Sequence, residues 1–272
     1  KYSNLFRSRI ILKIIFKDSY KILLSKNLNK FKGLIINKTK MTYSFMLAKE
    51  FTEGMKLPKE LTGSKVPIGW LLSEKYDGYR ARYVSENNCF LSRAQKGFNA
   101  PDWFKSAMIP THNLDGELWA GRENFQDMGV VRKKDPDPLE WKNIKYIVYD
   151  LPEYDAPFEQ RIKILKELVE LNNYRWNLIR QELGEPYSSM ECPLVMADQI
   201  LIKDMKQFKG LYQDIVKKGG EGVMIKDPLS QYEDKRSNYL LKVKPNFDAE
   251  AIIMDYSPGK KKYEGMLGGF VC

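Results

Sequence analysis

Residues 74–80 of this chain read Glu-Lys-Tyr-Asp-Gly-Tyr-Arg, and only Ser73 separates them from the apolar run Trp70-Leu71-Leu72. A lysine at the end of a short strand, followed by an Asp-Gly turn and an arginine, suits a reaction in which an amine attacks a nucleotide phosphate. A free lysine ammonium has a pKa of about 10.4 and is a poor nucleophile. Cations crowded into one cleft would disfavour its charge and release the lone pair of Lys75. The chain offers four such cations, which are Arg80, Arg93, Lys242 and Lys244.

Composition places the chain among globular proteins. Its 272 residues are 43% hydrophobic and 29% charged, and no apolar run approaches the roughly 20 residues that cross a bilayer. The three cysteines, Cys89, Cys192 and Cys272, lack metal-ligand spacing and are odd in number, so we expect a reducing intracellular compartment (nucleus, cytoplasm or an organelle) and no membrane partner. The one histidine, His112, is expected to be structural.

The basic character lies in the first 40 residues. They hold 11 Lys and Arg and a single acid, Asp18, of the 45 basic and 35 acidic residues in the chain, so the remaining 232 residues carry 34 of each sign. A basic, acid-poor segment is typical of an organelle-targeting or nucleic-acid-binding arm. The alternatives are a loosely attached extension or translated sequence upstream of a start at Met41.

From Met41 onward, the sequence predicts an α/β domain. Residues 70–73 read as a short strand, residues 80–84 and 89–92 as a hairpin, and residues 144–151 as a strand buried on both faces. Helices are predicted over 158–183 and 203–218, the second ending before Gly219. Further short strands are predicted over 113–120, 222–226 and 239–244.

Other residues complete the parts of a nucleotide site. On a strand, Lys242 and Lys244 would point to the same face and present two ammonium groups to one ligand. Glu117 follows a Gly turn and could accept hydrogen bonds from a ribose, while Glu221, in a second such turn, could hold a divalent ion against phosphates. Tyr149 offers an aromatic face to a base. Taken singly, each of these also fits an ordinary turn, a solvated strand face or a core position.

The order of these motifs resembles the covalent nucleotidyltransferase superfamily, and most closely the ATP-dependent DNA ligases of the minimal bacterial and viral type. The nucleophile motif matches residues 74–80, and the later motifs match residues 91–93, 114–118, 146–151, 221–226 and 241–245. Segments 93–104, 118–122 and 158–161 are also similar. The resemblance runs from about Gly69 to Cys272. It implies an adenylation domain of the ATP-grasp-like DNA ligase type, of class α/β (α+β), with antiparallel sheets flanked by helices.

The resemblance also implies a role for each position. Lys75 would attack the α-phosphate of ATP, release pyrophosphate and carry AMP, with Lys242 and Lys244 stabilising charge on the transferring phosphate. AMP would pass to the 5′-phosphate of nicked duplex DNA, and a 3′-hydroxyl would displace it and seal the nick. Nucleotide binding is implied for Glu74, Arg80, Arg93, Glu117, Tyr149, Glu221, Lys242 and Lys244, and binding of Mg²⁺ or Mn²⁺ for Glu221 and Glu117.

The domain organisation expected on this basis is a leader over 1–40, an adenylation domain over 41–246 and the start of an OB-fold domain over 247–272. That OB-fold is expected to be incomplete, and the basic last motif of the family is not found in the chain. A monomer acting in DNA repair, replication or recombination is expected. Two alternatives remain open at this point: an RNA ligase or messenger-RNA capping guanylyltransferase, and an inactive nucleic-acid-binding protein on the same fold.

Overall fold

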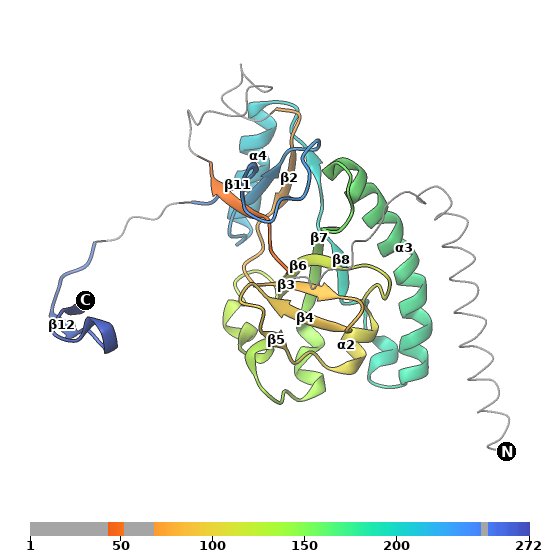
Figure 1. Ribbon diagram of the computed structural model, residues 1–272, viewed down its shortest axis with the longest axis horizontal. Helices are drawn as coiled ribbons and strands as arrows, with labels where there is room; N and C mark the ends of the chain where they lie inside the picture. Colours follow the sequence, from red (N-terminus) through yellow and green to blue (C-terminus); the bar gives the residue numbers. More distant parts are fainter. Residues whose placement is uncertain (1–42, 52–67, 246–249) are drawn as a thin grey trace.

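The computed structural model describes residues 43–51, 68–245 and 250–272. Its elements form two large β-sheets with helices beside them, and a third sheet of two strands near the C-terminus (Figure 1). The predicted leader over 1–40 lies outside the described residues. Nothing in the described ranges forms a helix long and apolar enough to cross a bilayer.

The first sheet has six strands in the order β5-β4-β3-β6-β7-β8, and all its pairs are antiparallel except β7 with β8. The predicted hairpin is confirmed as β3 and β4, joined by residues 85–88. The buried strand predicted over 144–151 is β7. The strands are β3 (Tyr79–Val84), β4 (Cys89–Ser92), β5 (Gly97–Phe98), β6 (Leu114–Trp119), β7 (Lys145–Asp150) and β8 (Leu194–Met196).

The second sheet has five strands in the order β1-β11-β10-β2-β9, with β1 and β11 parallel and the other pairs antiparallel. β11 starts three residues before the predicted strand, because its first residues pair with β1. It ends at Val243, one residue before the predicted end. The strands are β1 (Leu47–Glu50), β2 (Leu71–Glu74), β9 (Ile200–Leu201), β10 (Val223–Lys226) and β11 (Arg236–Val243).

The two long helices cover different sheets (Figure 1). α3 (Phe158–Leu183) has the predicted bounds and packs its apolar face on β7 and β8. α4 (Met205–Lys217) starts two residues later than predicted, because the side chain of Asp204 caps it by accepting a hydrogen bond from the backbone of Gln207 at 2.8 Å. Gly219 follows with φ of 80°, as a C-terminal glycine does. The short helices are α2 (Asp102–Ser106), η2 (Phe125–Arg132), η3 (Pro138–Asn143), η4 (Tyr187–Ser189) and η5 (Lys261–Tyr263).

Each sheet has its own hydrophobic core. Trp103, Phe104, Trp141 and Trp176 belong to the core of the six-stranded sheet, and Trp70 with Phe208 to that of the five-stranded sheet. Between β2 and β3 the chain passes from one sheet to the other through residues 75–78. Lys75 therefore lies where the two sheets meet.

The described C-terminal residues form an antiparallel pair, β12 (Asp255–Pro258) with β13 (Leu267–Val271). Their side chains are almost all exposed, including Tyr256 and Phe270. Such a pair is a short antiparallel hairpin. The OB-fold assignment of residues 247–272 stays a prediction.

Candidate active site

The backbone fixes Lys75 at the end of β2. Its amide N–H donates to the carbonyl of Gly222 at 2.9 Å, next to the β2–β10 ladder. Its Nζ forms an ion pair with Glu221, which follows α4 and the Gly219-Gly220 turn. The predicted nucleophile and the predicted metal ligand are thus in direct contact.

Gly78 explains the Asp-Gly pair that follows the lysine. A Cβ at Gly78 would lie 2.1 Å from the carbonyl oxygen of Leu118, which no side chain tolerates. The missing side chain lets the chain close onto β6, where Arg80 pairs with Glu117 across the ladder. The turn therefore sets the distance between Lys75 and the strand that carries Glu117.

A cavity of about 340 Å³ opens between the two sheets, a size typical of small-ligand sites. Of the predicted site residues, Glu74, Lys75, Arg80, Arg93, Glu117, Tyr149 and Lys242 line it. Glu221 reaches the site through its ion pair with Lys75. Lys244 lies beyond the end of β11, is exposed, and is not among the lining residues. The sequence thus predicted a set of residues that the fold mostly brings together.

The lining is strongly cationic. Six of its eighteen residues are Lys or Arg, against three acids, so an anion is the ligand that the cavity favours. The predicted crowding of cations is found, but the nearest partner of Lys75 is the carboxylate of Glu221. The basic lining residues are Lys75, Arg80, Arg93, Lys226, Arg236 and Lys242.

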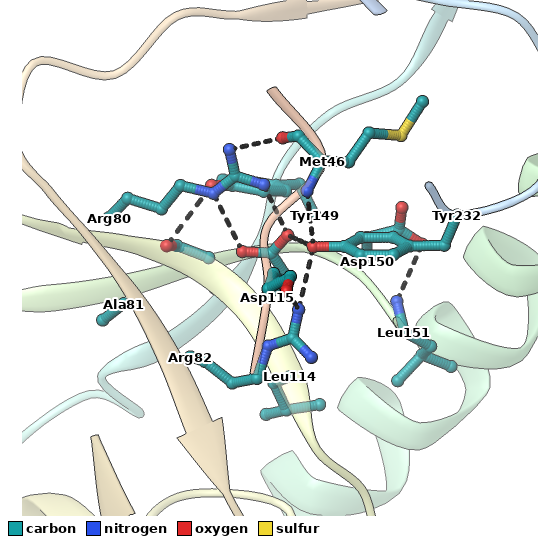
Figure 2. A network of polar contacts seen from close by, with 12 residues as sticks. Met46, Arg80, Ala81, Arg82, Leu114, Asp115, Tyr149, Asp150, Leu151 and Tyr232 are labelled. Atoms are coloured by element: carbon teal, nitrogen blue, oxygen red, sulfur yellow. Dashed lines mark hydrogen bonds and ion pairs between the residues drawn. The ribbon is translucent and has the colours of Figure 1, made fainter. Parts of the chain in front are cut away.

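Arg80 belongs to a polar network that the sequence did not predict (Figure 2). Its guanidinium donates to both oxygens of Asp115, at 3.1 and 2.7 Å, and to the carbonyl of Met46 at 2.7 Å. Tyr232 donates to the same carboxylate at 2.6 Å. Arg80 therefore reaches the cavity with much of its hydrogen-bonding capacity in use. Asp115, Gly116 and Glu117 lie within β6, so the Gly turn expected before Glu117 is wrong. The alternation of Asp115 and Glu117 along the strand was the available signal.

Glu117 is held in a setting that disfavours its charge. Burial raises the pKa of Glu117 to about 8, against the attraction of Arg80 and Lys75, and the carboxylates of Asp115 and Glu221 raise it further. Within the described residues, no hydrogen bond reaches its side chain. A cation or a hydrogen-bond donor from a ligand would stabilise its ionised form.

The carboxylates of Glu117 and Glu221 suit a hard cation. Mg²⁺ is commonly held by one or two protein carboxylates together with substrate phosphates and water. In the part of the chain that the structure describes, no three acidic, His or Cys side chains are grouped to hold a metal by themselves. Glu117 and Glu221 therefore fit a metal that arrives with a nucleotide, and do not form a site of their own.

Tyr149 lines the cavity from β7. Its hydroxyl donates to the carbonyl of Gly116 at 3.4 Å, and the guanidinium carbon of Arg80 lies 5.7 Å from the centre of its ring. The ring is thus fixed at one end by the backbone of β6. It is placed to contact a planar ligand, as predicted for a base.

A second buried ionic group joins the two sheets behind the cavity. Asp150, on β7, accepts hydrogen bonds from Arg161 of α3 at 2.6 and 3.0 Å and forms an ion pair with Lys226 of β10. Burial alone would raise the pKa of Asp150, but Lys226 and Arg161 outweigh it and lower the pKa to about 2. Lys226 also lines the cavity. In the sequence it was marked only as the last residue of the motif at residues 221–226.

The fold and the site together define a protein with a cationic cavity between two sheets and a lysine in its lining. The comparisons with known proteins give the family. A family model described as "ATP dependent DNA ligase domain" matches residues 45–244, which is well over half of the chain. The chain belongs to the ATP-dependent DNA ligase family.

Individual relatives agree with this assignment. The DNA ligase of Haemophilus influenzae is 27% identical over 212 residues, covering 78% of this chain and 71% of the bacterial one. The DNA ligase of African swine fever virus is 24% identical, and the match covers 70% of this chain but only 45% of the viral one. A solved structure of a Lig E DNA ligase superposes with a TM-score of 0.65 at 24% identity, covering 85% of this chain and 79% of that one, and so shares the fold.

These matches confirm the predicted resemblance to minimal ATP-dependent DNA ligases and the predicted class of fold. They favour the ligase reading over the capping-enzyme and RNA-ligase alternatives.

Proposed function

We propose that this chain seals nicks in duplex DNA through a covalent lysine–AMP intermediate formed on Lys75. The observation that carries the proposal is the placement of Lys75 at the mouth of a cationic cavity between the two sheets. The membership of the chain in the ligase family supports ATP as the nucleotide.

In the first step the neutral amine of Lys75 attacks the α-phosphorus of ATP. An N–P bond forms, the bond to the bridging oxygen breaks, and pyrophosphate leaves with the bonding electrons and takes up the proton that Nζ loses. Glu221 accepts a hydrogen bond from Nζ and directs the amine toward the phosphate. Lys242 and Arg93 offer their charges to the phosphate oxygens, where charge develops during transfer.

The remaining cavity residues bind the nucleoside. Glu117 takes the ribose hydroxyls, and Tyr149 packs against the adenine. Glu117 and Glu221 would hold Mg²⁺ or Mn²⁺ with the phosphates. Such an ion supplies charge neutralisation of the phosphate oxygens. Lys244 would reach the phosphate only after a movement of the residues that follow β11.

In the second and third steps AMP moves from Lys75 to the 5′-phosphate at a nick, and the 3′-hydroxyl then displaces AMP. Arg93, which is exposed and lines the cavity, would meet the DNA phosphate. We extend the proposal to the chain as a whole, with residues 41–246 as the adenylation domain and 247–272 as the start of an OB-fold.

The test is incubation of the protein with ATP labelled at the α-phosphate and magnesium chloride. A covalent label should appear, and it should be absent from Lys75→Ala. Label from GTP but not ATP would point to a capping enzyme, and sealing of nicked RNA but not nicked DNA would point to an RNA ligase. Salt-sensitive DNA binding without any label would leave only a binding protein.

A further inference from the structure

One segment contacts both chain neighbours of Lys75. Arg122, in the loop after β6, donates from Nε to Oε1 of Glu74 at 2.8 Å and from its terminal nitrogen to Oε2 at 2.7 Å. Trp119, at the end of β6, packs edge-on against Tyr76, with the ring centres 5.2 Å apart. The lysine therefore lies between two residues that are held by residues 119–122.

The ion pair between Arg122 and Glu74 is bidentate, which fixes the relative orientation of the guanidinium and the carboxylate as well as the distance between them. The Glu74 side chain is 13% exposed and that of Arg122 is 31% exposed. Both carboxylate oxygens of Glu74, a predicted nucleotide-binding residue that lines the cavity, thus accept hydrogen bonds from Arg122.

The same arginine also reaches the segment that carries Glu221. A terminal nitrogen of Arg122 lies 3.5 Å from the carbonyl of Lys218, at the end of α4. Gly219 and Gly220 follow, and a Cβ at Gly220 would lie 3.1 Å from Oε1 of Glu74. Because Gly220 has no side chain, the Glu74–Arg122 pair can pack against the residues that lead to Glu221.

We propose that Arg122 is a positioning residue for the adenylation of Lys75, acting through Glu74 to hold Lys75 in register with Glu221. This inference rests on the proposed function of Lys75. Arg122 follows β6 of the six-stranded sheet, whereas Glu74 ends β2 and Glu221 precedes β10 of the five-stranded sheet. Its ion pair therefore sets how the two walls of the site meet at the nucleophile.

The substitutions are Arg122→Ala and Arg122→Lys, with Arg132→Ala as the matched control on an exposed face of η2. The first readout is the rate of lysine–AMP formation at saturating ATP. Arg122→Ala should lower it about 100-fold, since a misplacement near 1 Å costs about that much. Arg122→Lys, which keeps the charge but not the two-pronged contact, should fall between Arg122→Ala and the unsubstituted protein. Arg132→Ala should not change the rate.

The second readout separates positioning from folding. Sealing of a nick that already carries AMP on its 5′-phosphate forms no bond to Lys75. Arg122→Ala should seal such DNA as fast as the unsubstituted protein. An equal loss in adenylation and in this sealing step would overturn the proposal in favour of a general structural role, and full adenylation by Arg122→Ala would overturn it outright.

The third readout does not depend on ligase activity. Brief treatment with acetic anhydride and mass spectrometry of the digest gives the acetylation of Lys75 relative to the exposed Lys206. Release of Lys75 from Glu221 in Arg122→Ala should raise that ratio. If the unsubstituted protein forms no adduct with AMP, the proposed function fails. An acetylation ratio in Arg122→Ala equal to that of the unsubstituted protein overturns the positioning role, whether or not an adduct forms.

Discussion

The buried ion group at Asp150 gives a prediction that the structure makes quantitative. In Asp150→Asn the shape of the side chain is kept and its charge is removed. The side chains of Asp150 and Arg161 are 1% and 0% exposed, and that of Lys226 is 9% exposed. The substitution therefore leaves two cations without a counter-charge in the wall between the two sheets.

Breaking a buried ion pair in this way costs about 3–5 kcal/mol of unfolding free energy. For a domain of this size the melting temperature should fall by about 6–20 °C. Urea and thermal denaturation at pH 7, followed by tryptophan fluorescence, measure the loss. The matched control is Asp155→Asn, because Asp155 is exposed in the loop that follows β7.

The pH dependence of the unfolding free energy gives a second, independent test of the role of Asp150. The pKa of Asp150 is lowered in the folded state to about 2, from 3.8. Its stabilisation is therefore fully present above about pH 4 and is lost as the pH falls toward 2. Across that window the gap between the unsubstituted protein and Asp150→Asn should narrow by about 2 kcal/mol. A loss at pH 7 no larger than that of Asp155→Asn would show that Asp150 does not offset the charges of Arg161 and Lys226.

Two further predictions follow from the site. Glu117→Gln removes a carboxyl group whose pKa is raised, and whose ionisation destabilises the fold as the pH rises from about 4.5 to 8. Between pH 5 and pH 9, the unfolding free energy of this variant, measured by urea denaturation, should rise by about 2–4 kcal/mol relative to that of the unsubstituted protein. The range is set below the full effect of the pKa shift because Glu117 is partly exposed to solvent. Gly222→Ala should lose at least about 2 kcal/mol of unfolding free energy, since φ is 147° and the added Cβ would lie 2.2 Å from the carbonyl of Val243.

These two predictions have their own controls. An unchanged pH slope in Glu117→Gln would show that the carboxyl group is not held in an unfavourable setting. Gly210→Ala, in α4 with open space around its Cα, should stabilise by about 0.5–1 kcal/mol. If Gly222→Ala is as stable as Gly210→Ala, Gly222 does not approach the backbone of Val243 as closely as the structure shows.

Local features of the fold were predictable because local spacing determines them. The hairpin at residues 85–88 and the helix α3 follow from turn residues and from apolar spacing over a few turns. More than one antiparallel sheet was expected from the resemblance, but the assignment of strands to each sheet was not predicted. It depends on pairings such as β1 with β11, which lie far apart in the sequence, and no local period reports them.

The candidate site shows the same division. The order of the motifs was enough to collect Lys75, Glu117, Tyr149 and Lys242 around one cavity. It did not show that Arg80 is engaged by Asp115, or that Glu74 is engaged by Arg122. Those contacts depend on which side chains face each other across a sheet or between sheets, and that information appears only with the three-dimensional fold.

The AMP carrier is identified by mapping the covalent adduct. The protein is incubated with ATP and magnesium chloride, digested, and sequenced by mass spectrometry. If Lys75 carries AMP, one AMP is added to the peptide that contains Lys75, and none is found in Lys75→Ala. AMP attached to any other residue, or an adduct that persists in Lys75→Ala, would show that Lys75 is not the carrier.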